Sequence, residues 1–357
     1  MDRREGEMSH KSEYSMGNTA QEKGSSHVPD RYLLPPSNRP SQSMEMAVIP
    51  IIDISGLGKS SHDRSLVVKE IGNACQNIGC FQIVNHGIDP KVMSKVIAAA
   101  SDFFNLPMKE KREFMSNDVN KPVRYGTSIK DGVDRVQYWR VFLKHYAHPL
   151  EEWIASWPEN PPNYRENMGR FSSEVRRVSI EVLGAITESL GLGPKYLNEE
   201  FEQGMQVIAV NCYPPCPHPD LALGLPPHTD YTCITILLQS HPGLEVMDMK
   251  DGTWRALQES AQGALQVNIG DHMEVLSNGV CKSVVHRATL NSETTRISIA
   301  SLQSLGMDVK IRSADELVDE EHPRVYKETS FREFLKFLST NDMSEGTSYI
   351  DTLRIKE

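Results

Sequence analysis

The chain has 357 residues, of which 39% are hydrophobic and 24% are charged, the composition of an ordinary globular protein. Its formal net charge of −10 argues against nucleic acid or an anionic membrane surface as a partner, because both require clustered Lys and Arg. No apolar run reaches the roughly 18 residues that span a bilayer, and the N-terminus has no hydrophobic signal segment. Six cysteines are too few for a disulfide scaffold, so we expect a cytoplasmic protein with free thiols.

The first part of the chain, residues 1–46, is polar and has no apolar periodicity, so we expect a mostly disordered leader. Within it, the Tyr-Leu-Leu-Pro-Pro run at 32–36 could dock on the folded body. Order is predicted to begin at 48–54, a short apolar run that is typical of a strand.

Three amphipathic helices are predicted in the next part of the chain. Apolar residues recur at helical spacing within 66–78, 92–104 and 163–190. A strand at 81–84 leads into the turn Asn85-His86-Gly87. We therefore assign residues 47–200 to a helical region with edge strands.

From residue 205 onward, short β-branched runs alternate with turn signals. The runs cover residues 207–210, 234–238, 244–247, 264–269, 283–286 and 297–301. Asp251-Gly252 and Asn278-Gly279 are typical of hairpin turns. This pattern predicts an antiparallel sandwich or jelly roll over 201–305.

The closing segment, 306–357, is predicted to contain a helix. Ser330 and Glu333 have the spacing of a capping box, and apolar residues follow them.

Candidate chemistry begins with histidines that stand two residues before an acid. The sequence holds three such pairs, His218 with Asp220, His228 with Asp230 and His272 with Glu274. Chance alone predicts about 1.6 pairs, so one pair is weak as a motif. Prolines around His218 exclude a regular strand there. The other two pairs lie in strand-like segments, where residues i and i+2 share a face.

A mononuclear iron(II) site requires two His and one carboxylate on one face of the ion. His286 completes such a set with either remaining pair, so residue patterns alone leave both sets open. Arg296 and Ser298 share a strand face beyond His286. A guanidinium inside a barrel needs an anionic partner, for which an anionic cosubstrate is the simplest choice, although an exposed or internally paired Arg296 is the alternative.

Several motifs together resemble the iron(II)/2-oxoglutarate-dependent dioxygenases of plant specialised metabolism, including the flavanone 3-dioxygenase and anthocyanidin synthase types. The motifs are Pro-Pro-His-Thr-Asp-Tyr-Thr at 226–232, Asn-Gly-Val-Cys-Lys-Ser-Val-Val-His-Arg at 278–287, Arg-Ile-Ser at 296–298 and Asn-Cys-Tyr-Pro-Pro-Cys-Pro at 211–217. Segments 49–53, 79–87 and 103–107 resemble the family's N-terminal region. The likeness covers roughly residues 47–340 and selects His228 and Asp230 over His272 and Glu274.

The resemblance implies a mixed α and β fold, with a double-stranded β-helix (jelly-roll) core flanked by N-terminal and C-terminal helices. It implies that His228, Asp230 and His286 bind Fe(II), that Arg296 and Ser298 hold the distal carboxylate of 2-oxoglutarate, and that Tyr213 and Asn211 orient this cosubstrate. By the same resemblance, the residues that border the substrate pocket are Phe142, Lys144, Leu302, Ser304 and Phe331.

The implied reaction consumes 2-oxoglutarate and O2, releases succinate and CO2, and hydroxylates or desaturates a small plant metabolite. Flavonoids, other phenylpropanoids, terpenoids, alkaloids and hormones all remain possible substrates, and the resemblance adds ascorbate as reductant and a monomeric state. Three alternatives stay open: an ascorbate-using oxidase of the aminocyclopropane-carboxylate type, an inactive jelly-roll binding protein and a zinc hydrolase.

Overall fold

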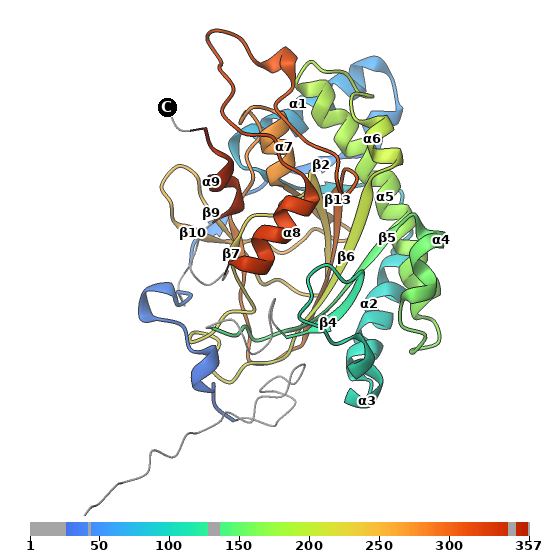
Figure 1. Ribbon diagram of the computed structural model, residues 1–357, viewed down its shortest axis with the longest axis vertical. Helices are drawn as coiled ribbons and strands as arrows, with labels where there is room; N and C mark the ends of the chain where they lie inside the picture. Colours follow the sequence, from blue (N-terminus) through green and yellow to red (C-terminus); the bar gives the residue numbers. More distant parts are fainter. Residues whose placement is uncertain (1–25, 42–43, 128–135, 342–347, 356–357) are drawn as a thin grey trace, which may run out of the picture.

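Residues 26–41, 44–127, 136–341 and 348–355 are described by a computed structural model, in which the strands form two sheets (Figure 1). In this part of the chain, the large sheet has eight strands in the order β2 Ile51–Asp53, β3 Cys80–Val84, β11 Leu265–Ile269, β8 Ile234–Gln239, β13 Arg296–Ser304, β6 Met205–Tyr213, β5 Val141–His148 and β4 Val123–Gly126. The small sheet has five, in the order β1 Met46–Ala47, β10 Trp254–Leu257, β9 Leu244–Met247, β12 His286–Ala288 and β7 Leu225–His228. Residues of both sheets line one cavity, so the sheets face each other across it.

Helices cover the large sheet and the opening between the sheets. The α-helices of the described residues are α1 Ser61–Asn77, α2 Pro90–Asn105, α3 Met108–Lys111, α4 Leu150–Trp153, α5 Tyr164–Ser189, α6 Asn198–Glu202, α7 Asp271–Leu276, α8 Phe331–Thr340 and α9 Tyr349–Leu353. Figure 1 shows α2 and α5 packed side by side on the outer face of the large sheet. In α8, Phe334 and Leu338 reach the cavity between the sheets. In the described residues, no helix combines the length and apolar character needed to cross a membrane.

The three predicted long helices form where their apolar spacing indicates. Side chains that cap the N-termini help to define two of them, since Ser60 accepts from Asp63 N–H before α1 and Asp89 accepts from Lys91 N–H before α2. Ser330 and Glu333 form the predicted capping box of α8.

The N-terminal region also supplies strands to the large sheet, at both of its edges. Strands β2 and β3 extend one edge, while β4 and β5 extend the other. The sequence reading missed β4 and β5, whose charged residues interrupt the apolar pattern. It also missed β7, because Pro226 and Pro227 remove backbone donors that a central strand would need. The strand tolerates them because it lies at the edge of the small sheet.

The hairpin prediction around Asn278-Gly279 is wrong, and so is the strand expected at His272 and Glu274. The chain forms α7 there instead, after Gly270. Asn278 and Gly279 have φ values of 52° and 84°, and the Gly279 N–H donates to Glu274 O at 2.8 Å. The pair therefore ends a helix in the left-handed conformation, a role that Asn and Gly share with hairpin turns. By contrast, the predicted turn at Asp251-Gly252 joins the antiparallel strands β9 and β10.

Part of the expected leader packs on the body of the protein. Tyr32 and Leu34 are buried, and the Tyr32 ring meets Trp139 edge-on with centroids 5.2 Å apart. The Leu34 N–H donates to Leu221 O at 3.0 Å. Residues 1–25, also assigned to the leader, lie outside the described residues.

Candidate active site

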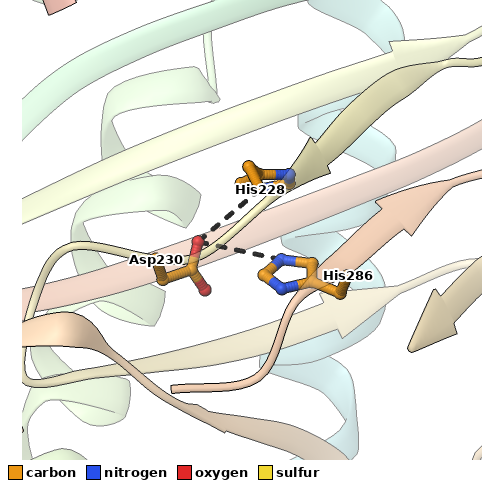
Figure 2. Close-up of side chains that lie close together, drawn as sticks. All are labelled: His228, Asp230 and His286. Carbon is orange, nitrogen blue, oxygen red and sulfur yellow. Dashed lines mark ion pairs between the residues drawn. The ribbon is translucent and has the colours of Figure 1, made fainter. Parts of the chain in front are cut away.

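Two neighbouring strands bring three metal-ligating side chains together (Figure 2). Strands β7 and β12 are antiparallel, and His228 lies directly opposite His286 in their register. Asp230 follows in the turn after β7, and its Oδ1 lies 3.8 Å from Nε2 of each histidine. One potential ligand atom from each residue lies within 4.8 Å of the others. Sequence reasoning placed His228 and Asp230 on one strand, whereas the strand ends at His228.

Backbone carbonyls orient both imidazoles. The Nδ1–H of His228 donates to Pro226 O at 2.8 Å, and that of His286 donates to Val284 O at 3.1 Å. With Nδ1 protonated, each Nε2 keeps its lone pair for a ligand. Burial, and then the nearby His286, lowers the pKa of His228 to about 4, so its ring is neutral at pH 7.

This set of donors fits a divalent cation. The separations of 3.8 Å are too long for hydrogen bonds between the carboxylate and the rings. Oδ2 of Asp230 is buried and has no hydrogen-bond partner among the described residues. Because a buried carboxylate oxygen is costly unless it is paired, a cation beside it would remove that cost. Two imidazoles and one carboxylate suit iron(II).

The competing pair, His272 and Glu274, lies in α7 and has other partners. The carboxylate of Glu274 accepts from Tyr326 Oη–H at 2.5 Å and from Ser283 N–H at 2.7 Å. His272 is buried with its ring edge-on to Tyr231, at a centroid distance of 6.0 Å. The structure brings His286 together with His228 and Asp230, and gives Glu274 a structural role.

Arg296 lies in the same cavity as the three ligands, at the start of β13, and is only 2% exposed. Its Nε–H donates to His241 O at 3.0 Å and its Nη2 donates to Gln239 Oε1 at 2.7 Å. The guanidinium also lies 4.9 Å from the centroid of the Tyr213 ring. Nη1 is buried without a hydrogen-bond partner among the described residues, which suits an anion bound beside it.

The other residues expected to contact the cosubstrate lie next to Arg296 on the sheet. In the pairing of β6 with β13, Tyr213 faces Arg296 and Asn211 faces Ser298. Asn211 Nδ2 lies 3.4 Å from Ser298 Oγ.

Sequence reasoning missed Gln239 and Gly243, which position the guanidinium. Gly243 has a φ of 146°, and a Cβ there would lie 2.9 Å from Cδ of Arg296. Only glycine permits this close approach. For Gln239, the available signal was its position directly after a predicted strand, 234–238, which extends to Gln239 in the structure.

The cavity has a volume of about 220 Å³ and contains all three ligands and Arg296. Of the residues expected in the substrate pocket, Phe142, Lys144 and Leu302 line it. Ser304 and Phe331 are not among its lining residues: Ser304 Oγ lies 3.5 Å from His272 Nδ1, and the Phe331 ring packs on Tyr231 with centroids 4.7 Å apart. Arg140 and Phe334 also line the cavity, and lining residues that the sequence did not point to include Arg124, Tyr231 and Leu338.

Comparison with known proteins identifies the family. Residues 49–164 match the family described as non-haem dioxygenase in morphine synthesis N-terminal, and residues 204–304 match the 2OG-Fe(II) oxygenase superfamily. The chain belongs to the 2OG-Fe(II) oxygenase superfamily. It is a 2-oxoglutarate-dependent dioxygenase that uses Fe(II), 2-oxoglutarate and O2.

Relatives of this dioxygenase align over most of their length. It is 46% identical to flavanone 3-dioxygenase 3 of Oryza sativa subsp. japonica over 323 residues, 90% of this chain and 98% of that protein. It is 48% identical to 2-oxoglutarate-dependent dioxygenase 21, chloroplastic, from the same organism, over 90% of this chain and 93% of that protein. A crystal structure of JOX2 in complex with 2OG, Fe and JA matches with a TM-score of 0.78 and 32% identity, covering 89% of this chain and 91% of that one. The predicted mixed α and β fold with a jelly-roll core is thereby confirmed.

Proposed function

We propose that His228, Asp230 and His286 hold Fe(II) on one face of the ion, and that Arg296 binds the distal carboxylate of 2-oxoglutarate. In this proposal, Ser298, Asn211 and Tyr213 complete the cosubstrate site. The observation that carries the proposal is the shared cavity, in which three converging ligands lie with a buried guanidinium whose Nη1 has no hydrogen-bond partner among the described residues. When bound, iron(II) and 2-oxoglutarate supply the redox chemistry of O2 activation.

The protein's own contribution is orientation and the exclusion of water. Carbonyl groups of Pro226 and Val284 fix both imidazoles, while Gln239 and the His241 carbonyl fix the guanidinium. At the opening, the Phe334 ring of α8 stacks on Tyr231 with centroids 3.5 Å apart and an interplanar angle of 10°. This aromatic cover limits the access of water to the reacting centre.

The substrate that we propose is a small, moderately apolar plant metabolite, which is hydroxylated or desaturated. A flavonoid is one candidate, supported by the name of the rice flavanone 3-dioxygenase. The volume of about 220 Å³ and the side chains of Phe142, Leu302 and Phe334 favour a compact molecule with an apolar body.

Three further features belong to the same proposal: ascorbate as reductant, a monomeric state and a cytoplasmic location. Six free cysteines support a reducing compartment. The name of one relative places that protein in the chloroplast, so cell fractionation is the measurement for this chain.

The test is succinate release by the purified chain with Fe(II), O2 and a panel of plant metabolites. We expect turnover to require 2-oxoglutarate, and Asp230→Ala to lower it at least 10³-fold, because the ion loses its one carboxylate ligand. Glu274→Gln is the matched control, since Glu274 lies in α7 outside the cluster; we expect most activity to remain in molecules that stay folded. Turnover without any 2-oxo acid would favour the ascorbate-using oxidase, and turnover by the Asp230 variant would contradict the ligand assignment.

A further inference from the structure

Strand β5 and the residue that precedes it, Arg140, present a row of cationic and aromatic side chains to the cavity. Arg140, Phe142 and Lys144 alternate along extended chain, and all three line the cavity. On the neighbouring strand β4, Arg124 pairs with Lys144 in the register and lines the cavity as well. The guanidinium carbons of Arg124 and Arg140 each lie 4.9 Å from the centroid of the Phe142 ring.

These cations are additional to the one that 2-oxoglutarate would use. Among the described residues, Asp230 is the one carboxylate that lines the cavity. With Fe(II) and 2-oxoglutarate bound, the charges of the ion, Asp230, the cosubstrate and Arg296 cancel. In the part of the cavity formed by β4 and β5, no described carboxylate lines the wall beside Lys144.

Lys144 is the lysine of this row, and its described partners are one carbonyl group and one aromatic ring. Its Nζ donates to Val119 O at 3.1 Å and lies 4.8 Å from the centroid of the Tyr146 ring. Within the described ranges it forms no ion pair with a carboxylate. Burial, and then the charge of Arg124, lowers the pKa of Lys144 to about 7. An anion beside the ammonium would stabilise its charged form, and so oppose the lowering of the pKa by burial and by Arg124.

The surroundings of Lys144 leave space for such a group. Across the sheet its neighbours in register are Ala209 and then Ala300, whose small side chains also line the cavity. Apolar side chains of Leu302, Phe334 and Leu338 line the same cavity. A ligand that fills this space meets a cationic strand face on one side and apolar groups elsewhere.

We propose that the substrate is an apolar carboxylic acid whose carboxylate is bound by Lys144, with Arg124 beside it, and whose hydrocarbon part packs on Phe142 and Leu302. This inference rests on the proposed function, because it places the substrate beside the same iron and cosubstrate sites. It narrows the substrate from moderately apolar metabolites in general to those with an anionic end.

The test uses the full-length protein loaded with Fe(II) and saturating 2-oxoglutarate without oxygen. Calorimetry compares benzoate, cinnamate and naphthalene-2-carboxylate with their primary amides, which have nearly the same shape without the charge, and with the neutral flavanone naringenin. We expect at least one acid to bind about 10-fold or more tightly than its amide. Lys144→Met should weaken binding of the acid about 10-fold and leave binding of the amide unchanged, while Lys144→Arg should restore most of the preference.

Three results would overturn the inference. The first is that no acid binds, or that every acid binds no more tightly than its amide and than naringenin. The second is a preference for acids that survives in Lys144→Met. The third is competition of the acids with 2-oxoglutarate, which would place them at Arg296. Succinate release by the wild-type protein, dependent on iron and 2-oxoglutarate, reports on the proposed function separately, since it can persist when all three acids fail to bind.

Discussion

The nitrogens of a single guanidinium show how the fold prepares for an anion. Nε and Nη2 of Arg296 are held by His241 O and Gln239, whereas Nη1 is buried without a hydrogen-bond partner in the described part of the chain. A side chain fixed at two of its nitrogens loses little further freedom when the third binds, so the site is organised before the cosubstrate arrives. Lys144 differs, because one carbonyl and one ring hold it and its charge depends on pH.

The lowered pKa of Lys144 predicts how binding of a carboxylic acid depends on pH. The groups that act on its ammonium are Arg124, which lowers the pKa further, and Asp118, which opposes this. The Lys144 amine is protonated and charged below its pKa of about 7, and it loses this charge above that pH. The carboxylate of the ligand stays ionised over the whole range. We therefore expect the dissociation constant of the acid to rise up to about 10-fold between pH 6 and pH 8.5, measured by calorimetry with iron and 2-oxoglutarate saturating.

Lys144→Arg is the control for this pH dependence, because a guanidinium stays charged over the whole range. A flat profile in the wild-type protein, or the same slope in the Lys144→Arg variant, would show that another group titrates.

At the scale of single elements, α7 shows why a local pattern can predict the wrong structure. His272 and Glu274 alternate as strand residues would, yet backbone contacts after Gly270 begin a helix instead. The N–H of Asp271 donates to Asp230 O at 2.7 Å, and the N–H of His272 donates to Thr232 O at 3.2 Å. These partners lie far away in the sequence, so periodicity contains no information about them. The same contacts connect α7 to the turn that carries Asp230.

Gly270 allows this approach, so we predict that Gly270→Ala damages the metal site. An added Cβ would overlap the carbonyl of Thr232 and lie 2.7 Å from Asp230 O, and backbone atoms cannot move aside as a flexible side chain can. We expect a loss of about 3 kcal/mol in the free energy of unfolding, together with weaker iron binding. Denaturant titration and iron titration measure the two effects.

Gly58→Ala is the matched control, since a Cβ there meets nothing within 4 Å. Its free energy of unfolding should change by less than about 0.5 kcal/mol. Equal free energies of unfolding and equal iron binding in the two variants would refute the importance of the close contact between Gly270 and the backbone of Thr232.

Across the whole molecule, the sequence predicted the long helices and most of the strands, because their burial follows helical or alternating spacing. It also predicted the three side chains that converge, His228, Asp230 and His286, although the choice over His272 and Glu274 required the family resemblance. What it could not supply were contacts between distant segments, such as Gly243 against Arg296. Likewise, the cationic face of β5 becomes visible only once Arg124 of β4 is placed beside Lys144.

Tyr32 is a further long-range contact, and it braces the segment that leads into β5. The ring packs on Trp139, and the Gln137 N–H donates to Arg31 O at 2.8 Å. We expect Tyr32→Ala to reduce the free energy of unfolding by about 3 kcal/mol, because it leaves a cavity beside a buried Trp. Ser37→Ala, on an exposed side chain nearby, should cost less than about 0.5 kcal/mol. Indistinguishable denaturation curves for the two variants would mean that this contact contributes little.

The proline pair in β7 also has a consequence for how copies of the protein meet. An outermost strand ordinarily exposes a row of backbone donors and acceptors, onto which a strand of another molecule can add. Pro226 and Pro227 have no N–H to offer, so the border that carries His228 is a poor template for such intermolecular pairing. The two prolines that precede His228 thus also disfavour aggregation through that edge of the sheet.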